Sequence, residues 1–266
     1  PALADRGEYI ASESTFYRIL RDADMMHHRG RTAAPVSRPS KPEGFCATAA
    51  NQVWSWDITY CASALRGVFY YLYLIMDIYS RKIVGWEVHE SESSEHAATL
   101  VRKACLAEQV EENQLILHSD NGSPMKGAVM LSTLQKLGVA PSFSRPSVSN
   151  DNPYSEALFK TFKYRPDYPT KPFADIDTLR EWTQDFVKWY NNEHHHSALQ
   201  YVTPVQRHTG EDMALLRQRT TVYEQAKVNK PERWSGNTRN WSHSNEVWLN
   251  PSQGQANDEI QMKKSA

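Results

Sequence analysis

The sequence predicts an α/β fold: a mixed five-stranded sheet with flanking helices, between a partial N-terminal helix-turn-helix and a helical C-terminal extension. Three apolar, strand-like segments follow one another after Val53. Tight connections at 65–67 and 79–81 join them, which predicts an antiparallel meander. Helical and strand patterns then alternate as far as about residue 164. Such alternation adds further strands to a sheet and covers the sheet with helices.

Composition is that of an ordinary globular chain, with 266 residues, a net charge of −1, 40% hydrophobic residues and 23% charged residues. No apolar run approaches the roughly 20 residues of a membrane-spanning helix, and no secretory signal is present. Three scattered cysteines, Cys46, Cys61 and Cys105, predict neither a disulfide framework nor a zinc site. We therefore expect a protein of the reducing cytoplasm. Because residue 1 is Pro rather than Met, the sequence is compatible with a fragment or a processed form of a protein.

Basic residues are concentrated in two segments. Residues 17–41 and residues 213–240 each hold six Lys or Arg against two acids. Two basic segments that flank a more acidic central region would suit a protein that binds a polyanion with its two ends. Solvated surface faces, however, have the same composition. Charge alone does not decide between them.

Residues 2–29 have the pattern of two helices. The second, over 13–28, carries Phe16, Ile19 and Leu20 at helical spacing, with Arg18 and Arg21 on its outer face. This fits the second half of a DNA-binding helix-turn-helix, although a plain helical hairpin has the same pattern. Residues 30–50 hold three prolines and little periodicity, so we expect a linker there.

The central region, 51–170, is expected to form the sheet domain. Strands are predicted over 53–60, 67–78, 82–89, 114–120 and 140–146. Helices are predicted over 93–109, over 123–138 with Pro124 near the start and Gly138 at the end, and after Pro153. Residues 171–266 are expected to form a helical extension and a tail, with an amphipathic helix over 174–196 and another from Thr203. The fold of residues 220–266 stays open.

Three acids are candidates for one site on this sheet. Asp57 lies inside an apolar strand, where burial is costly unless the carboxylate binds something positive. Asp120 directly follows the apolar strand "LIL", in "HSDNGS". Glu156 begins a helix, and the 35 residues between Asp120 and Glu156 hold one helix and one strand, enough to return the chain to the sheet.

Carboxylate oxygens are the ligands that magnesium prefers, and magnesium keeps room for phosphate and water. Two such ions can activate an attacking hydroxyl and stabilise the leaving oxygen in phosphodiester chemistry. Asn152, Lys160 and Lys163 share the helical face of Glu156, and this positive charge would suit a phosphate backbone. Each feature alone is typical of an exposed turn acid or a solvated helix, and the joint pattern is a stronger indication than any of its parts.

The segments "VWSWDITY", "LILHSDNGSP" and "SNDNPYSEALFKTFK" together resemble the core of retroviral-type integrases and bacterial insertion-sequence transposases. The second-frame product of the insertion sequence 3 family is the most similar, over about 12–210. The resemblance implies a ribonuclease-H-like fold and a magnesium-dependent DNA transposase, with Mn²⁺ as a substitute ion. Asp57, Asp120 and Glu156 match the catalytic triad of that family, and Lys163 matches its basic DNA-contacting position.

The sequence also departs from this resemblance. Residues 194–196 read His-His-His where family members more often carry an Arg, and no His₂Cys₂ zinc segment is present. Adjacent histidines on a helix point about 100° apart, so we interpret His194–His196 as surface or packing residues. His118 is expected to point to the other side of the sheet or to support the loop after it.

We therefore predict a transposase that cleaves insertion-sequence ends and performs strand transfer. Its partners would be terminal inverted repeats and target DNA, it would work as a homo-oligomer on DNA, and it would act in the bacterial cytoplasm at the nucleoid, without a membrane. Lys160, Lys163, Arg18 and Arg21 are the candidate DNA contacts. A nuclease of the same fold that cuts without joining, or a catalytically silent DNA-binding regulator, stays as an alternative.

Overall fold

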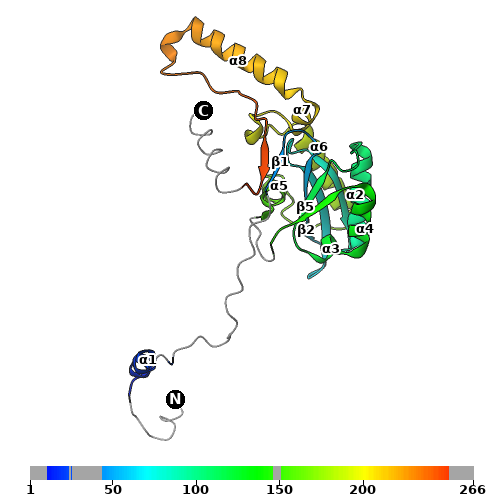
Figure 1. Ribbon diagram of the computed structural model, residues 1–266, viewed down its shortest axis with the longest axis vertical. Helices are drawn as coiled ribbons and strands as arrows, with labels where there is room; N and C mark the ends of the chain where they lie inside the picture. Colours follow the sequence, from blue (N-terminus) through cyan, green and yellow to red (C-terminus); the bar gives the residue numbers. More distant parts are fainter. Residues whose placement is uncertain (1–10, 24, 26–43, 146–150, 252–266) are drawn as a thin grey trace. The chain divides into compact units, whose positions relative to one another are not determined.

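The computed structural model describes residues 11–23, 25, 44–145 and 151–251 (Figure 1). The chain divides into two compact units, 1–40 and 41–266. In the first unit, helix α1 (Glu13–Asp22) begins at Ser12, whose hydroxyl accepts the Thr15 amide. The helix predicted over 13–28 is shorter than expected, because the backbone leaves the helix at Ala23. The first of the two predicted helical pieces, which ends at Gly7, lies outside the described residues.

The second unit is built on the predicted mixed five-stranded sheet, with strand order β4-β3-β2-β5-β6. β2, β3 and β4 form an antiparallel meander, whereas β5 and β6 run parallel to β2. β2 is central because it pairs with β3 on one side and with β5 on the other. The strands are β2 (Val53–Ala62), β3 (Phe69–Asp77), β4 (Ile83–His89), β5 (Ile116–Ser119) and β6 (Ala140–Phe143).

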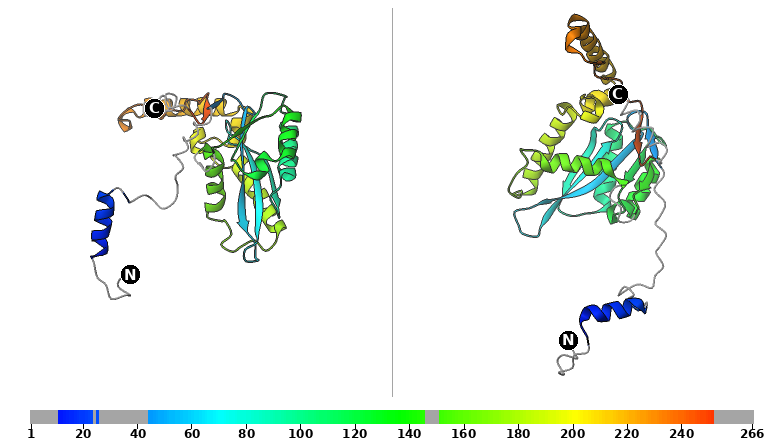
Figure 2. Two further views of the ribbon diagram at one scale, coloured as in Figure 1. Left: turned by 60° about the horizontal axis from the view of Figure 1, so that its bottom comes forward. Right: turned by 90° about the vertical axis from the view of Figure 1, so that its left-hand side faces the viewer.

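Helices cover both faces of this sheet (Figure 2). On one face, α2 (Ser94–Ala107) and α4 (Ala128–Leu137) bury a core that includes Trp54 and Trp56 of β2. On the other face, α5 (Pro153–Tyr164) packs against β2 and β3 and α6 (Ile176–Asn192) against β4, with Phe162 and Phe186 in the core. Successive strand residues point to opposite faces, so Asp57 lies on the α5 face.

The single helix predicted over 123–138 was wrong, since the structure has two. A short α3 (Ser123–Lys126) precedes α4, and Gly127 separates them in an extended conformation. A Cβ at Gly127 would lie 2.4 Å from the Ser94 Cβ, so the break brings the backbone close against the start of α2. Packing overrides the helical pattern here.

The C-terminal extension is helical, as predicted, and then returns to the sheet domain. It contains η3 (Ser197–Leu199), α7 (Pro204–Thr209), α8 (Asp212–Asn229), η4 (Pro231–Arg233) and β7 (Val247–Leu249). β7 pairs antiparallel with β1 (Phe45–Ala47). β1 lies inside the stretch 30–50 that the sequence led us to expect as linker. None of the helices in the described part of the chain has the length and apolar composition to span a membrane.

Candidate active site

Asp57 stands at the middle of β2, half-buried on the face that α5 covers. Its Oδ1 accepts the Ile58 amide at 2.8 Å. Burial and the charge of Asp120 raise the pKa of Asp57 to about 7, and Glu156 and Glu92 add to this rise, whereas the Ile58 amide opposes it. The carboxylates of Asp120, Glu156 and Glu92 therefore all lie within electrostatic range of Asp57.

Asp120 follows the end of β5, at the edge of the sheet where a loop begins. The Ser144 hydroxyl donates to Asp120 Oδ1 at 3.0 Å, so the end of β6 helps to fix this carboxylate. The Asn121 side chain donates to the Ser144 carbonyl at 3.1 Å and ties the same two segments together. Asp120 stays half-buried.

Glu156 lies in the first turn of α5, and a buried polar cluster holds that turn against β2. Ser55 donates to Asn152 Oδ1 at 2.5 Å and lies 2.6 Å from the Ser155 hydroxyl. Asn152 donates in turn to the Trp56 carbonyl at 3.2 Å. Asn152 was expected to share the outer face of Glu156, but it is buried and bound to β2. These contacts place Glu156 beside the strand that carries Asp57.

Two further polar residues lie near these acids, Glu92, which the sequence did not identify, and His118. Glu92, in the loop before α2, accepts the Tyr60 hydroxyl at 3.0 Å and adds its charge to the surroundings of Asp57. His118 is fully buried, and its ring bonds Ser142 and the Asp151 carbonyl, each at 2.9 Å. It shares the sheet face of Asp120, as i and i+2 positions of an extended segment do. His118 therefore lies on the same side of the sheet as Asp120, not on the other side, and it supports the segment that leads into α5 rather than the loop that follows it.

The donor set is chemically suited to a hard divalent cation, because it consists of carboxylates whose charges repel one another. Within the described ranges, however, no three His, Cys, Asp or Glu side chains stand close enough together to hold a metal ion. The fold thus brings Asp120 and Glu156 within electrostatic range of Asp57, although the three side chains do not lie at coordination distance around one point.

The candidate DNA contacts fall in two places. On α5, Lys160 is exposed and Lys163 half-buried, and the Lys163 charge acts on the Cys61 thiol of β2. Burial nevertheless raises the pKa of Cys61 to about 11. Arg18 and Arg21 are exposed on α1, which belongs to the other unit.

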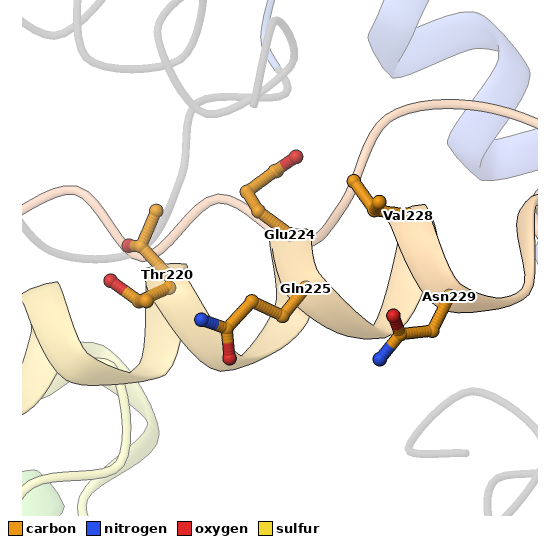
Figure 3. Close-up of a pocket in the computed structure, with 6 residues that line it drawn as sticks. Thr220, Glu224, Gln225, Val228 and Asn229 are labelled. Atoms are coloured by element: carbon orange, nitrogen blue, oxygen red, sulfur yellow. The ribbon is translucent and has the colours of Figure 1, made fainter.

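The histidine run after α6 takes part in packing. The His194 ring stacks on Tyr190, and His196 Nδ1 accepts the Ala198 amide at the start of η3. Burial lowers the pKa of His196 to about 4, with the Arg81 charge adding to the effect. A shallow depression of about 600 Å³ lies elsewhere, on α8 (Figure 3). Its lining is mostly uncharged: Thr220, Thr221, Glu224, Gln225, Val228 and Asn229.

Comparison with known proteins agrees with the fold. A family model described as Integrase core domain matches residues 47–149, and a second of the same description matches residues 137–204. The transposase for insertion sequence element IS904 of Lactococcus lactis subsp. lactis (strain IL1403) is 34% identical over 182 residues, covering 66% of this chain and 69% of its own length. The putative transposase for IS986/IS6110 of Mycobacterium tuberculosis (strain CDC 1551 / Oshkosh) is 28% identical, covering 61% of this chain and 59% of its own length.

Among solved structures, the HTLV-2 integrase catalytic core domain in complex with magnesium (trimeric form) aligns with a TM-score of 0.47 at 16% identity, covering 60% of this chain and 97% of that one. A simian T-cell lymphotropic virus intasome in complex with a PP2A regulatory subunit aligns with a TM-score of 0.48 at 18% identity, covering 78% of this chain and 69% of that one.

The fold and the matched segments thus define a protein with an integrase core domain built on a mixed five-stranded sheet. The chain belongs to the transposases of bacterial insertion sequences.

Proposed function

We propose that this chain is a DNA transposase that cleaves insertion-sequence ends and joins them to target DNA at a site formed by Asp57, Asp120 and Glu156. The observation that carries the proposal is the placement of the acids: Asp57 and Asp120 each follow one residue of the Trp56–Ser119 pair on adjacent strands, and the first turn of α5 with Glu156 is held against β2. In agreement with this placement, burial and the charges of Asp120 and Glu156 raise the pKa of Asp57 to about 7. Since the acids come from β2, the end of β5 and α5, their convergence depends on the whole core fold.

A divalent cation fits this donor set, because a positive charge between the acids would relieve their repulsion and favour the ionised form of Asp57. Asp57, Asp120 and Glu156 would hold Mg²⁺, with Mn²⁺ as a substitute. When bound, Mg²⁺ supplies activation of an attacking hydroxyl and stabilisation of the leaving oxygen at phosphorus.

The other residues would orient the acids and the substrate. The Ile58 amide and the Ser144 hydroxyl fix the carboxylates of Asp57 and Asp120. Lys160 and Lys163, on the helix that carries Glu156, would neutralise backbone phosphates of the DNA end. Water as nucleophile would give end cleavage, and a DNA 3′-hydroxyl in its place would give strand transfer.

The partners follow from this chemistry. We propose terminal inverted repeats and target DNA as substrates, and a homo-oligomer that holds two DNA ends in the bacterial cytoplasm at the nucleoid. We propose that residues 1–29, with Arg18 and Arg21, contribute to a helix-turn-helix for DNA, and that the stretch from residue 30 to the start of β1 links it to the core. Residues 51–170 form the catalytic core, and residues 171–266 form its C-terminal extension.

The test is a labelled oligonucleotide of the element end incubated with the protein, Mg²⁺ and a target duplex. Cleavage that exposes a 3′-hydroxyl, followed by joined products, is the expected result. Cleavage without joining under the same conditions would instead indicate a nuclease. Specific binding with neither product would indicate a regulator and would contradict the proposal.

A further inference from the structure

Asp151 forms a junction immediately before α5. Its side chain is buried, and its carboxylate accepts hydrogen bonds from the Arg145 amide and guanidinium at 2.9 Å. Its carbonyl accepts two more, from His118 Nε2 at 2.9 Å and from Asn250 Nδ2 at 2.8 Å. The strand β5, the segment before α5 and the C-terminal segment therefore meet at Asp151, five positions before Glu156.

The directions of these bonds follow from the groups involved. A carbonyl oxygen can only accept, so His118 Nε2 must carry a proton toward Asp151. In a neutral ring, Nδ1 then accepts from the Ser142 hydroxyl. The strand that leads to Asp120 thus donates to the segment that leads to Glu156, and the separation of the two acids is set partly through this bond.

The contact of Asn250 brings in the C-terminal segment. Asn250 follows β7 in a left-handed conformation, with a φ of 53°, and is buried. The segment also meets α5 a second time, because the Tyr154 hydroxyl donates to the Trp248 carbonyl at 2.6 Å. Leu249 and Val247 bury their side chains in the same cluster that Tyr154 borders. Residues 247–250 therefore touch α5 and its approach at Asp151 and at Tyr154, on either side of Pro153.

We infer that the C-terminal segment 247–250 is a positioning element for Glu156, acting through the Asn250–Asp151 and Trp248–Tyr154 hydrogen bonds. The inference rests on the proposed function. The matched integrase core segments end at residue 204, so this support comes from a part of the chain outside them. Ser55 holds the first turn of α5 toward β2, and residues 247–250 hold its approach through a different set of contacts. Loss of the second set would let α5 shift its first turn, where Glu156 lies, without unfolding the sheet.

The test compares three variants of the full chain. Asn250→Gly removes the donor and suits the positive φ. Tyr154→Phe removes only the hydroxyl. Asn245→Gly makes the same substitution as the first at an exposed residue of the same tail and serves as the matched control. Mn²⁺ affinity is measured by calorimetry, the Mg²⁺ dependence of end cleavage by titration, and the anchoring of α5 by hydrogen exchange of its amides, with circular dichroism to confirm folding.

We expect Asn250→Gly to weaken Mn²⁺ binding and to raise the half-saturating Mg²⁺ concentration about tenfold, as loss of an outer-shell partner does. The cleavage rate at saturating Mg²⁺ should approach that of the parent, which a general loss of folded protein would not allow. Exchange should rise at the amides of residues 157–160 of α5, which donate to the carbonyls of its first turn. Tyr154→Phe should change the Mn²⁺ affinity, the half-saturating Mg²⁺ concentration and the exchange in α5 in the same direction, and Asn245→Gly should change none of them. If Asn250→Gly does not fold, Tyr154→Phe decides the question alone.

Parental metal affinity and parental exchange in folded Asn250→Gly and Tyr154→Phe would overturn the inference. A parent chain that neither binds Mn²⁺ nor cleaves DNA would instead contradict the proposed function. In that case hydrogen exchange alone would test whether residues 247–250 anchor the start of α5, and unchanged exchange in both variants would overturn this anchoring.

Discussion

At the residue scale, the acids could be singled out from the sequence, but the residues that hold them could not. Asp57 interrupts an apolar strand and Asp120 ends one, and both are visible as local exceptions to a pattern. Ser55 and Asn152 have no such signal, because their hydrogen bond joins residues 97 positions apart. Contacts of this kind depend on the tertiary fold, so the environment of each acid had to come from the structure.

Lys163 offers a residue-scale test of the DNA-facing side of α5. Lys163→Ala should make the negative slope of log affinity against log salt for an end oligonucleotide shallower by about 0.9, because one phosphate contact is lost. Mn²⁺ affinity should stay unchanged, because no carboxylate is altered. Lys103→Ala is the control, since Lys103 is exposed on α2, which packs on the other face of the sheet. An unchanged slope for Lys163→Ala would show that Lys163 does not face the DNA backbone.

At the element scale, long periodic segments were predictable and short or interrupted ones were not. β2, β3 and α6 lie close to their predicted ranges, because each repeats its apolar pattern over many residues. β1 and β7 have three residues each and pair across some 200 positions, so neither carries a local signal. The break at Gly127 was missed because the apolar pattern continues through it, while the reason for the break is the nearby Ser94.

Gly127 therefore provides an element-scale prediction. Gly127→Ala should lower the free energy of unfolding by about 1–3 kcal/mol, because the new methyl group overlaps Ser94 and α2 must move away from α4. Urea denaturation measures the change. Gly236→Ala is the control, since a Cβ at Gly236 meets no atom within 4 Å. Equal stability of the two variants would mean that α2 and the α3–α4 break adjust without cost.

At the scale of the whole molecule, one ionic cluster joins the sheet domain to the C-terminal extension. Glu108, which ends α2, binds Lys82 at 2.6 Å and His208 of α7 at 2.8 Å. Burial alone would raise the pKa of Glu108, but the hydrogen bonds from His208 and Lys82 outweigh burial and lower the pKa to about 2. The cluster thus stabilises the contact between α7 and the core while Glu108 is ionised.

The sign of this shift gives a pH prediction. A carboxyl group with a lowered folded-state pKa stabilises the protein above its ordinary value of 4.5 and loses that contribution as pH falls toward 2. Parent and Glu108→Gln should therefore differ most in unfolding free energy near pH 6, by roughly 2 kcal/mol, and converge between about pH 4.5 and pH 2. Urea denaturation of both proteins across this range measures the difference. A difference that stayed constant with pH would rule out the ionised cluster as its source.

The central claim is that Asp57, Asp120 and Glu156 act as one site for cleavage and joining, and Asp120→Asn tests it most directly. The amide keeps the size of the side chain and can still bond Ser144, so circular dichroism should show a folded protein. Binding to DNA ends should persist, while Mg²⁺-dependent cleavage and strand transfer of an end oligonucleotide should both fall by orders of magnitude. Adding Glu156→Gln should reduce the rate little further, as for groups that act together. A folded Asp120→Asn protein that cuts and joins at close to the parental rate would contradict the assignment of the site.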